Sequence, residues 1–474
     1  MDLPKQAEDF PAWYQEVVKA ADLAESSLVR GSMVIKPYGY AIWEAIQSGL
    51  DRRIKATGHQ NVYFPMFIPY KLLEKETEHV EGFIPQVAIV THAGGEKLEE
   101  PLVVRPTSET IIWATYAKWI QSYRDLPLLY NQWANVVRWE MRTRLFLRTT
   151  EFLWQEGHTA HETGDEAMRE TLLVLNDVYK AAVEEDFAMP VITGRKTASE
   201  RFPGAQETYS IEAMMRDGKA LQAGTSHYFG QNFSKAYEVR FQGRDGQQEF
   251  PYSSSWGAST RLIGGLIMTH GDDKGLRLPP KLAPVQVVII PIYRGDEDKA
   301  RVLKACNEIS TDLDGVRVKI DDRDQYRPGY KFNEWELKGV PLRVELGPRD
   351  LEAGQVTVAR RDSGEKLALG LASLSTEIPR LLDQIQRGLY EQAKAFMDSS
   401  TVDPSSYDEM REFLSNHKGF ARSLWCGQES CEAKVKQDAK ATIRSVPIVQ
   451  EKVDGSCLVC GQPATDKAVW AQSY

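Results

Sequence analysis

The segment Val136–Glu140 places a guanidinium and a carboxylate two residues apart. Side chains of a β-strand alternate between its faces, so Arg138 and Glu140 would project to one side, opposite Val137 and Trp139. A half-buried strand avoids two charges on one face unless they meet a ligand or each other. The segment therefore indicates either a ligand-binding surface or a structural ion pair on an exposed sheet face.

A second segment, 148–158, supplies the other groups that a nucleotide site needs. The side chains that would share one strand face are Phe152, Trp154, Glu156 and His158. Together with Arg148, such a surface can stack a purine, bind phosphates and orient an amine. Further along, Arg261 enters an apolar, glycine-containing helix over Leu262–Thr269, where its guanidinium can hold a polyphosphate against the sheet.

Four of the five cysteines fall in the last 49 residues. They form two pairs, Cys426 with Cys431 and Cys457 with Cys460, separated by 25 residues. This spacing suits a tetrahedral Zn²⁺ site with four thiolate ligands, which would be structural because no position is left for water. The alternative is two reduced pairs without a metal. Cys306, on an expected helix, is a candidate core residue.

A framework must hold these groups, and residues 1–280 predict an antiparallel sheet with flanking helices. Helices are expected at Trp13–Leu28 and Tyr38–Thr57. The strand-like runs are Val62–Phe67, Leu102–Arg105, Leu128–Glu140, Phe152–Ala160, Glu207–Met214 and Leu221–Phe229. Short, irregular connections favour an α+β domain over a doubly wound parallel sheet. The sequence contains neither a P-loop nor a Gly-x-Gly-x-x-Gly motif.

Two further blocks follow. Residues 284–390 alternate strands and helices, which predicts a small α/β domain. Its strands are expected at Val285–Ile290, Val316–Ile320, Leu342–Leu346 and Gln355–Arg360, and its helices at Asp296–Leu313, Gly329–Lys338 and from Thr376 onward. The polar stretch Asp398–Ser406 has the composition of a linker. Residues 405–474, which hold the cysteine pairs, would then form a small zinc-binding α+β domain.

The overall composition narrows the class of protein. The 474 residues include 58 basic and 67 acidic side chains, a net charge of −9, which argues against a nonspecific nucleic-acid coat but not against a local RNA-reading surface. No apolar run approaches the ~20 residues of a membrane span. The N-terminus lacks a basic start followed by an apolar core. We therefore expect a cytoplasmic protein without membrane contact.

Considered together, these segments resemble the motifs of class II aminoacyl-tRNA synthetases. Arg138-Trp-Glu140 with Arg148, Phe152 and Glu156 resembles motif 2, and Gly257–Pro280 with Arg261 resembles motif 3. The stretch from Gly31 to Pro65 is similar to motif 1, which builds the dimer interface in that class. The class I signatures are absent from the sequence.

The ordered set of three shorter pieces resembles the prolyl-tRNA synthetase family in its archaeal/eukaryotic-like form, over nearly the whole chain. These pieces are Arg105–Glu109, Phe152–Thr159 and Gly224–Phe233. The resemblance implies a homodimeric, AMP-forming ligase that activates L-proline with ATP and transfers it to tRNA(Pro). Mg²⁺ would accompany ATP, with no carboxylate assigned to it, and Zn²⁺ would be structural.

The resemblance also implies roles for individual residues. Arg138 would bridge the α-phosphate and the substrate carboxylate, and Arg138 and Arg261 are the expected catalytic residues. The implied ATP-binding residues are Arg138, Glu140, Arg148, Phe152, Gln222, Thr225, Ser259 and Arg261. The implied proline-binding residues are Thr107, Glu109, Arg138, Trp154, Glu156, Phe202, His227 and Ser255. Trp154 and Phe202 are also open to a core role, and His227 to a hydrogen bond with a backbone carbonyl.

Outside the catalytic block, the resemblance assigns residues 284–390 to anticodon binding. Glu336 and Arg349 are the candidate tRNA contacts, each equally open to a solvated helix face. The terminal Tyr474 is expected to bring its carboxylate near the active site. The interval His161–Leu221, 61 residues long, leaves no room for the editing domain of the bacterial form. Because the carbons missing from alanine are worth only ~1–3 kcal/mol, we expect alanine to be activated without later hydrolysis of Ala-tRNA.

Two alternatives stay open. One is a synthetase for threonine, histidine or glycine; threonyl enzymes use a Cys/His/His zinc inside the active site, whereas here only Cys306 lies outside the C-terminal block. The other is a catalytically inert synthetase-like regulator or RNA-binding subunit. The joint presence of five groups argues against it: Arg138, Glu140, Arg148, Phe152 and Arg261.

Overall fold

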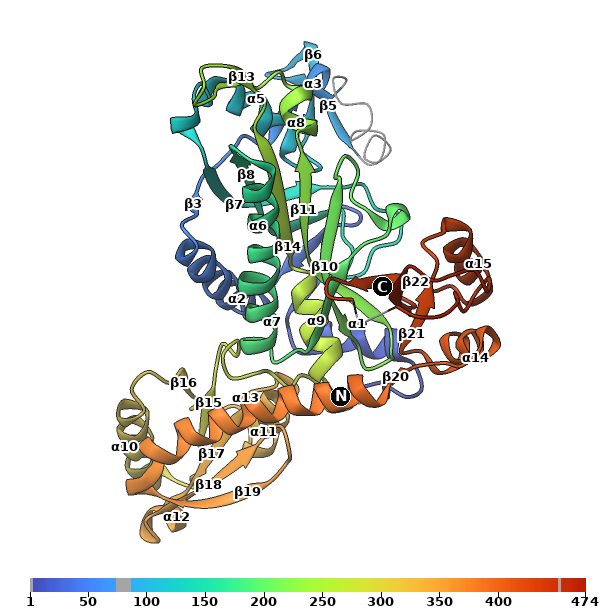
Figure 1. Ribbon diagram of the computed structural model, residues 1–474. Helices are drawn as coiled ribbons and strands as arrows, with labels where there is room; N and C mark the ends of the chain where they lie inside the picture. The colour runs from blue at the N-terminus through green and yellow to red at the C-terminus, as the bar shows by residue number, and fades with distance from the viewer. Residues whose placement is uncertain (1–2, 74–86, 451–452) are drawn as a thin grey trace.

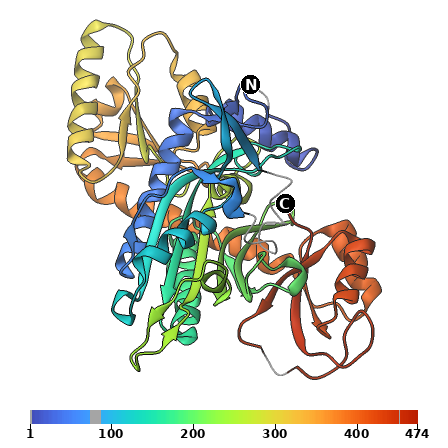
Figure 2. The ribbon, with the colours of Figure 1, turned by 90° about the horizontal axis from the view of Figure 1, so that it is seen from above.

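The structure is a computed structural model that describes residues 3–73, 87–450 and 453–474. Figure 1 shows a first block around a long sheet, a second block below it in yellow and orange, and a C-terminal block in red beside the sheet. Seen from above, the second and C-terminal blocks lie on opposite sides of the first (Figure 2). The long helix α13 (Leu374–Ser399) runs from the second block beneath the sheet toward the C-terminal block.

An antiparallel sheet forms the centre of the first block, with neighbours in the order β9-β10-β11-β14-β8-β7. The bounds are β7 Leu128–Val137, β8 Glu151–His161, β9 Val191–Arg195, β10 Glu207–Met214, β11 Ala220–Gly230 and β14 Tyr252–Ser259. The short β3 (Gln60–Asn61) pairs in parallel with β7. In β10, Tyr209 and Ile211 enter the hydrophobic core, so Ser210 and Glu212 point to the opposite face.

Helices cover the core face of this sheet. They are α1 Phe10–Ala20, α2 Pro37–Ala56, α6 Gly164–Leu173, the π-helical η3 Val174–Lys180, α7 Ala181–Glu185 and α9 Arg261–His270. Asp9 caps α1 by accepting a hydrogen bond from the Ala12 N–H at 2.9 Å, and Pro37 begins α2 where no N–H donor is needed. Their apolar faces pack with the sheet into one large core. The other, polar face of the sheet stays available for a ligand.

Smaller elements surround the upper end of the sheet. They are β4 Phe67–Pro69, α3 Tyr70–Leu73, β5 Ala88–Ala93, β6 Glu96–Val104, α5 Glu109–Trp119, α8 Asn232–Ala236, β12 Phe241–Gln242 and β13 Gln248–Glu249. The strands β1 Ala24–Ser26 and β2 Met33–Ile35 pair with each other and pack instead on the large core beside α1. The order β4-β6-β5 forms a separate three-stranded sheet. Trp113 and Tyr116 of α5 are buried in a cluster with Phe229 and Phe233, which fixes the start of α5 beside the central strands.

The second block is a five-stranded mixed sheet in the order β16-β15-β17-β18-β19. Its strands are β15 Val287–Pro291, β16 Val318–Ile320, β17 Leu342–Leu346, β18 Gln355–Arg360 and β19 Lys366–Gly370, and its helices are α10 Asp296–Asp312, α11 Pro328–Leu337 and α12 Pro348–Glu352. The first three strands are parallel and the last two antiparallel. Cys306 is buried in this block's core, as predicted.

The C-terminal block continues the sheet of the first block. Its elements are β20 Thr401–Val402, α14 Tyr407–Glu412, β21 Phe420–Trp425, α15 Glu429–Ala439, β22 Thr442–Pro447 and β23 Asp466–Ala471. Strand β22 pairs antiparallel with β9, so the full sheet has eleven strands. The two strands approach closely at Gly194, where an added Cβ would lie 2.0 Å from Ser445 Oγ and 2.5 Å from Val446 O. Only a glycine allows β22 to dock there.

Several expected elements differ from the observed ones. The helix expected at Trp13–Leu28 ends at Ala20, because Asp22 takes a positive φ and β1 follows. The strand expected at Val62–Phe67 is irregular up to Phe67, where β4 begins. The expected linker Asp398–Ser406 instead completes α13 and forms β20. Strands β9, β14 and β19 were not predicted, because each is short or rich in small residues. No helix in the described ranges is long and apolar enough to cross a membrane.

Candidate active site

The fixed register of the central strands arranges polar side chains in rows across the open face. One row runs through His158, Ser255, His227 and Thr208, each directly opposite the next. The next row contains Glu156, Gly257 and Thr225. In a third row Trp154 lies opposite Ser259. These rows line one cavity of about 190 Å³.

The cavity brings together the side chains expected to bind ATP and proline, apart from Glu140 and Arg148. It is lined by Thr107, Glu109, Arg138, Phe152, Trp154, Glu156, Phe202, Gln222, Thr225, His227, Ser255, Ser259 and Arg261. It also contains His158, which the sequence placed on this strand face without a role, and Glu200 and Thr208, which were not assigned to the site from the sequence. Thr208 could have been found from the alternation of the correctly predicted strand, whereas Glu200 lies in a loop without any pattern.

Arg138 is held by a backbone oxygen and two aromatic rings. Its Nε donates a hydrogen bond to Pro106 O at 2.9 Å. The guanidinium carbon lies 5.6 Å from the ring centroid of Phe152 and 5.4 Å from that of Trp154. These contacts fix the plane of the guanidinium, which suits it to bind an oxyanion through paired N–H groups.

Two buried carboxylates and a histidine lie beside Arg138. Thr107 Oγ1 donates a hydrogen bond to Glu109 Oε2, and His158 Nδ1 lies 3.9 Å from Glu109 Oε1. His158 Nε2 lies 2.8 Å from Glu156 Oε2. Burial lowers the pKa of Arg138, and the charges of Glu109 and Glu156 oppose that shift. This part of the cavity is therefore suited to a substrate that carries both an ammonium and a carboxylate.

Glu156 is anchored by three protein groups. Its Oε1 accepts hydrogen bonds from Ser108 Oγ at 2.5 Å and from Gln132 Nε2 at 2.6 Å, while its Oε2 meets His158. Both carboxylate oxygens are engaged by protein groups, so the main effect of Glu156 is to orient His158.

The other end of the cavity is cationic. Ser259 Oγ accepts a hydrogen bond from Arg261 N at 3.2 Å, and Arg261 Nε donates to Leu147 O at 3.2 Å. Burial lowers the pKa of Arg261 to about 10, with further lowering by the like charges of Arg148 and Arg138. Cations held this close to one another favour a polyanionic ligand between them.

The strand-face argument for Arg138 and Glu140 was wrong. Strand β7 ends at Val137, and both residues lie in the following hairpin, where Arg138 N donates to Thr150 O at 2.8 Å. Glu140 Oε2 instead lies 3.6 Å from Arg148 Nη1, and neither side chain lines the cavity. The ion-pair alternative thus describes Glu140, with Arg148 rather than Arg138 as its partner.

The aromatic end of the cavity is lined by Phe202 and His227, whose ring centroids are 4.5 Å apart. Thr208 Oγ1 lies 3.0 Å from His227 Nδ1 and accepts a hydrogen bond from Phe202 N at 3.0 Å. Thr208 therefore holds the ring of His227 and the backbone of Phe202. Phe202 lines the cavity and also packs against a hydrophobic cluster, so it combines the two roles that the sequence left open.

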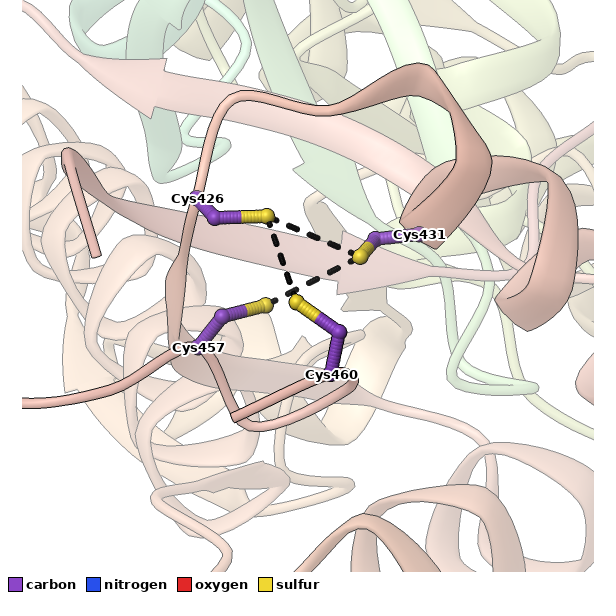
Figure 3. Close-up of side chains that lie close together, drawn as sticks. All are labelled: Cys426, Cys431, Cys457 and Cys460. Atoms are coloured by element: carbon purple, nitrogen blue, oxygen red, sulfur yellow. Dashed lines mark hydrogen bonds between the residues drawn. The ribbon is translucent and has the colours of Figure 1, made fainter. Parts of the chain in front are cut away.

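The four C-terminal cysteines converge on one point (Figure 3). Cys426 Sγ lies 3.6 Å from the sulfurs of Cys431 and Cys460, Cys457 Sγ lies 4.0 Å from Cys431 Sγ, and all four sulfurs lie within 4.8 Å of one another. Four thiolates around a tetrahedral Zn²⁺ at ~2.3 Å would be separated by about 3.8 Å. The donor set and its spacing therefore fit Zn²⁺.

The remaining candidates lie away from the cavity. Glu336 Oε1 accepts a hydrogen bond from Lys274 Nζ at 3.0 Å, and Arg349 lies on α12. Tyr474 packs against the large core and donates a hydrogen bond to Asp217 Oδ2 at 2.8 Å, and its backbone N donates to Ala220 O. Tyr474 does not line the cavity.

Comparison with known protein families agrees with this geometry. Residues 92–270 match a tRNA synthetase class II core domain (G, H, P, S and T), and residues 286–381 match an anticodon binding domain. The fold and site thus define a class II aminoacyl-tRNA synthetase. Residues 407–474, which include the four cysteines, match the prolyl-tRNA synthetase C-terminal domain.

Relatives over the full length identify the particular family. A proline–tRNA ligase of Acetoanaerobium sticklandii is 55% identical, over 100% of this chain and 98% of its own length. Proline–tRNA ligase 2 of Clostridioides difficile is 54% identical over the same shares, and a proline–tRNA ligase of Roseiflexus castenholzii is 53% identical over 99% and 98%. The chain belongs to the proline–tRNA ligase family.

Proposed function

We propose that this chain activates L-proline with ATP and then transfers it to the 3′ end of tRNA(Pro). A carboxylate oxygen of proline attacks the α-phosphorus of ATP, and the bond from that phosphorus to the departing pyrophosphate breaks. The observation that carries the proposal is one cavity with carboxylates at one end, cations at the other, and Arg138 between them. Such a cavity aligns the reactants and neutralises charge, which is what the reaction needs.

Proline would bind at the acidic and aromatic end. Glu109, held by Thr107, would pair with the secondary ammonium of proline, because a carboxylate is the apt partner for it. Trp154, Phe202, His227 and Ser255 would line the ring pocket, and Glu156 would act through His158. Arg138 would hold the carboxylate of proline and the α-phosphate together.

ATP would bind at the cationic end. Phe152 and Arg261 would enclose the adenine, with Gln222, Thr225 and Ser259 contacting the nucleotide. We propose that Glu140 reads the adenine amino group and Arg148 the γ-phosphate only after their mutual ion pair opens, because in this structure they face each other. Mg²⁺ bound to ATP would neutralise phosphate charge.

The remaining assignments concern the partners of the catalytic block. We propose domains at 1–280, 284–390 and 405–474, with Glu336 and Arg349 of the second contacting the anticodon and Zn²⁺ held by the third. The enzyme would act as a cytoplasmic homodimer. Exposed apolar side chains at Leu28 and Val29, just before the expected motif 1, and at Val34 within it support an interface there.

Exchange of labelled pyrophosphate into ATP, run with each of the twenty amino acids, tests the substrate assignment. We expect proline to support exchange, because it fits between Glu109 and the ring pocket. Exchange with only threonine, histidine or glycine would show that the enzyme activates that amino acid and not proline.

We also propose that the chain has no editing domain in cis. The interval between β8 and β11 is filled by α6, η3, α7, β9 and β10, which pack on the catalytic core. We expect alanine to support exchange with kcat/KM roughly 10- to 200-fold below that of proline, because a pocket discriminates weakly against missing carbons. The pure protein should leave alanyl-tRNA(Pro) intact. Rapid hydrolysis of that species, measured against buffer alone, would contradict the proposal.

A further inference from the structure

The loop between β9 and β10, residues 196–206, lies between two parts of the molecule. On one side it carries Glu200 and Phe202 into the cavity. On the other side it contacts the C-terminal block, whose strand β22 pairs with β9 through Val446 opposite Arg195. The wall of the cavity at this loop is therefore supported from outside the catalytic block.

Two side chains of the C-terminal block bind this loop directly. Ser199 Oγ donates a hydrogen bond to Glu432 Oε2 at 2.5 Å, and Glu432 directly follows Cys431 in the cysteine cluster. Arg444 Nη1 donates a hydrogen bond to Glu200 Oε2 at 3.4 Å. The loop is thus attached to the same block by a serine–carboxylate hydrogen bond and by an arginine–carboxylate ion pair.

Arg444 is itself fixed by a buried group of charges. Its Nη2 lies 3.2 Å from both carboxylate oxygens of Glu212, and Lys196 Nζ donates to Glu212 Oε1 at 2.6 Å. All three side chains are buried. Buried charges tolerate little displacement from their partners, so Arg444 is a stiff support for Glu200.

We infer that Arg444 and Glu432 are positioning residues for the amino-acid end of the active site, acting through the loop 196–206. By holding Ser199 and Glu200, they keep Phe202 against His227 at the aromatic end of the cavity. The C-terminal block therefore helps to determine how well the amino acid binds. This inference rests on the proposed function, because it takes the substrate of that end of the cavity to be proline.

A loosened loop should weaken binding of proline more than binding of ATP, since the loop carries Phe202 to the aromatic end of the cavity, beside His227. For Ser199→Ala we expect the KM for proline to rise roughly 5-fold, the effect of one lost hydrogen bond. For Arg444→Met we expect roughly 20-fold, because a buried charge partner is also lost. In Ser199→Ala the KM for ATP should stay within about twofold of the parent value. Arg444→Met also removes a charge that acts on Arg261, so there the KM for ATP should change by a smaller factor than the KM for proline.

Two controls separate this role from general damage. Glu432→Gln keeps an oxygen that accepts from Ser199 and should behave like the parent. Arg422→Ala breaks an exposed ion pair with Asp403 in the same block, away from the loop, and should change neither KM. Hydrogen exchange of peptides covering 196–206 should quicken in Ser199→Ala and Arg444→Met, while zinc content stays unchanged.

The outcomes are distinguishable from those of the proposed function. Exchange with proline by the parent, together with a selective rise in the KM for proline in the two variants, supports the inference. An unchanged KM for proline, or equal rises for proline and ATP, overturns it while the proposed function stands. If Arg444→Met fails to fold, the KM values of Ser199→Ala for proline and ATP alone decide whether the inference holds. A parent protein without proline-dependent exchange refutes the proposed function instead.

Discussion

Replacing Arg138 with alanine should lower kcat for proline-dependent pyrophosphate exchange by about 100- to 1000-fold. The guanidinium lies between the carboxylates and the cationic end, and it is held by Pro106 O and the rings of Phe152 and Trp154. Charge that develops on the α-phosphate during attack would lose its nearest prearranged partner. Steady-state exchange rates at saturating ATP and proline measure the effect.

Arg138→Lys is the matched control. It keeps a positive charge but loses the planar pair of N–H groups, so we expect activity between those of the parent and Arg138→Ala. Thermal unfolding of each variant separates a catalytic loss from a folding defect. A fall in kcat of less than tenfold in a folded Arg138→Ala protein would show that Arg138 does not stabilise the transition state.

The second large effect should follow from opening the cysteine cluster. We expect Cys431→Ser to reduce bound zinc from one ion per chain to a small fraction. The free energy of unfolding of the C-terminal block should fall by several kcal/mol, a part of the ~10–16 kcal/mol with which structural zinc binds small domains. Cys426, Cys431 and Cys457 also belong to the hydrophobic core of that block, so loss of the metal should loosen its packing. Elemental analysis and calorimetry measure the two quantities.

Cys306→Ala provides the comparison for this variant. It removes the fifth cysteine from the core of the second block, far from the cluster, and should leave zinc content unchanged. Unchanged zinc content and an unchanged unfolding profile in Cys431→Ser would show that the four sulfurs do not hold a metal.

The sequence predicted the elements with strong local patterns. Strands at Glu207–Met214, Leu342–Leu346 and Gln355–Arg360 were found with the observed bounds, because alternating or continuous apolar residues mark them. The sequence spacing of the four C-terminal cysteines predicted that their sulfurs meet at one point, because four ligands of one metal ion must lie close together.

Other features depend on contacts that no local pattern records. The strand-face reason for expecting Arg138 in the cavity was wrong, because β7 ends at Val137 where the hairpin begins. The pairing of β22 with β9 joins strands about 250 residues apart, so the support that Arg444 gives to Glu200 could not be read from either segment alone. Such long-range contacts require the folded chain.

Pyrophosphate exchange across the twenty amino acids, on the pure protein without tRNA, tests the central claim most directly. We predict the highest kcat/KM with proline, a weaker signal with alanine, and background with the others. A different preferred amino acid would keep the activation chemistry but contradict the assignment of Glu109, Phe202 and His227 to a proline pocket. Background exchange with all twenty, unchanged by added tRNA, would contradict the catalytic role of the cavity altogether.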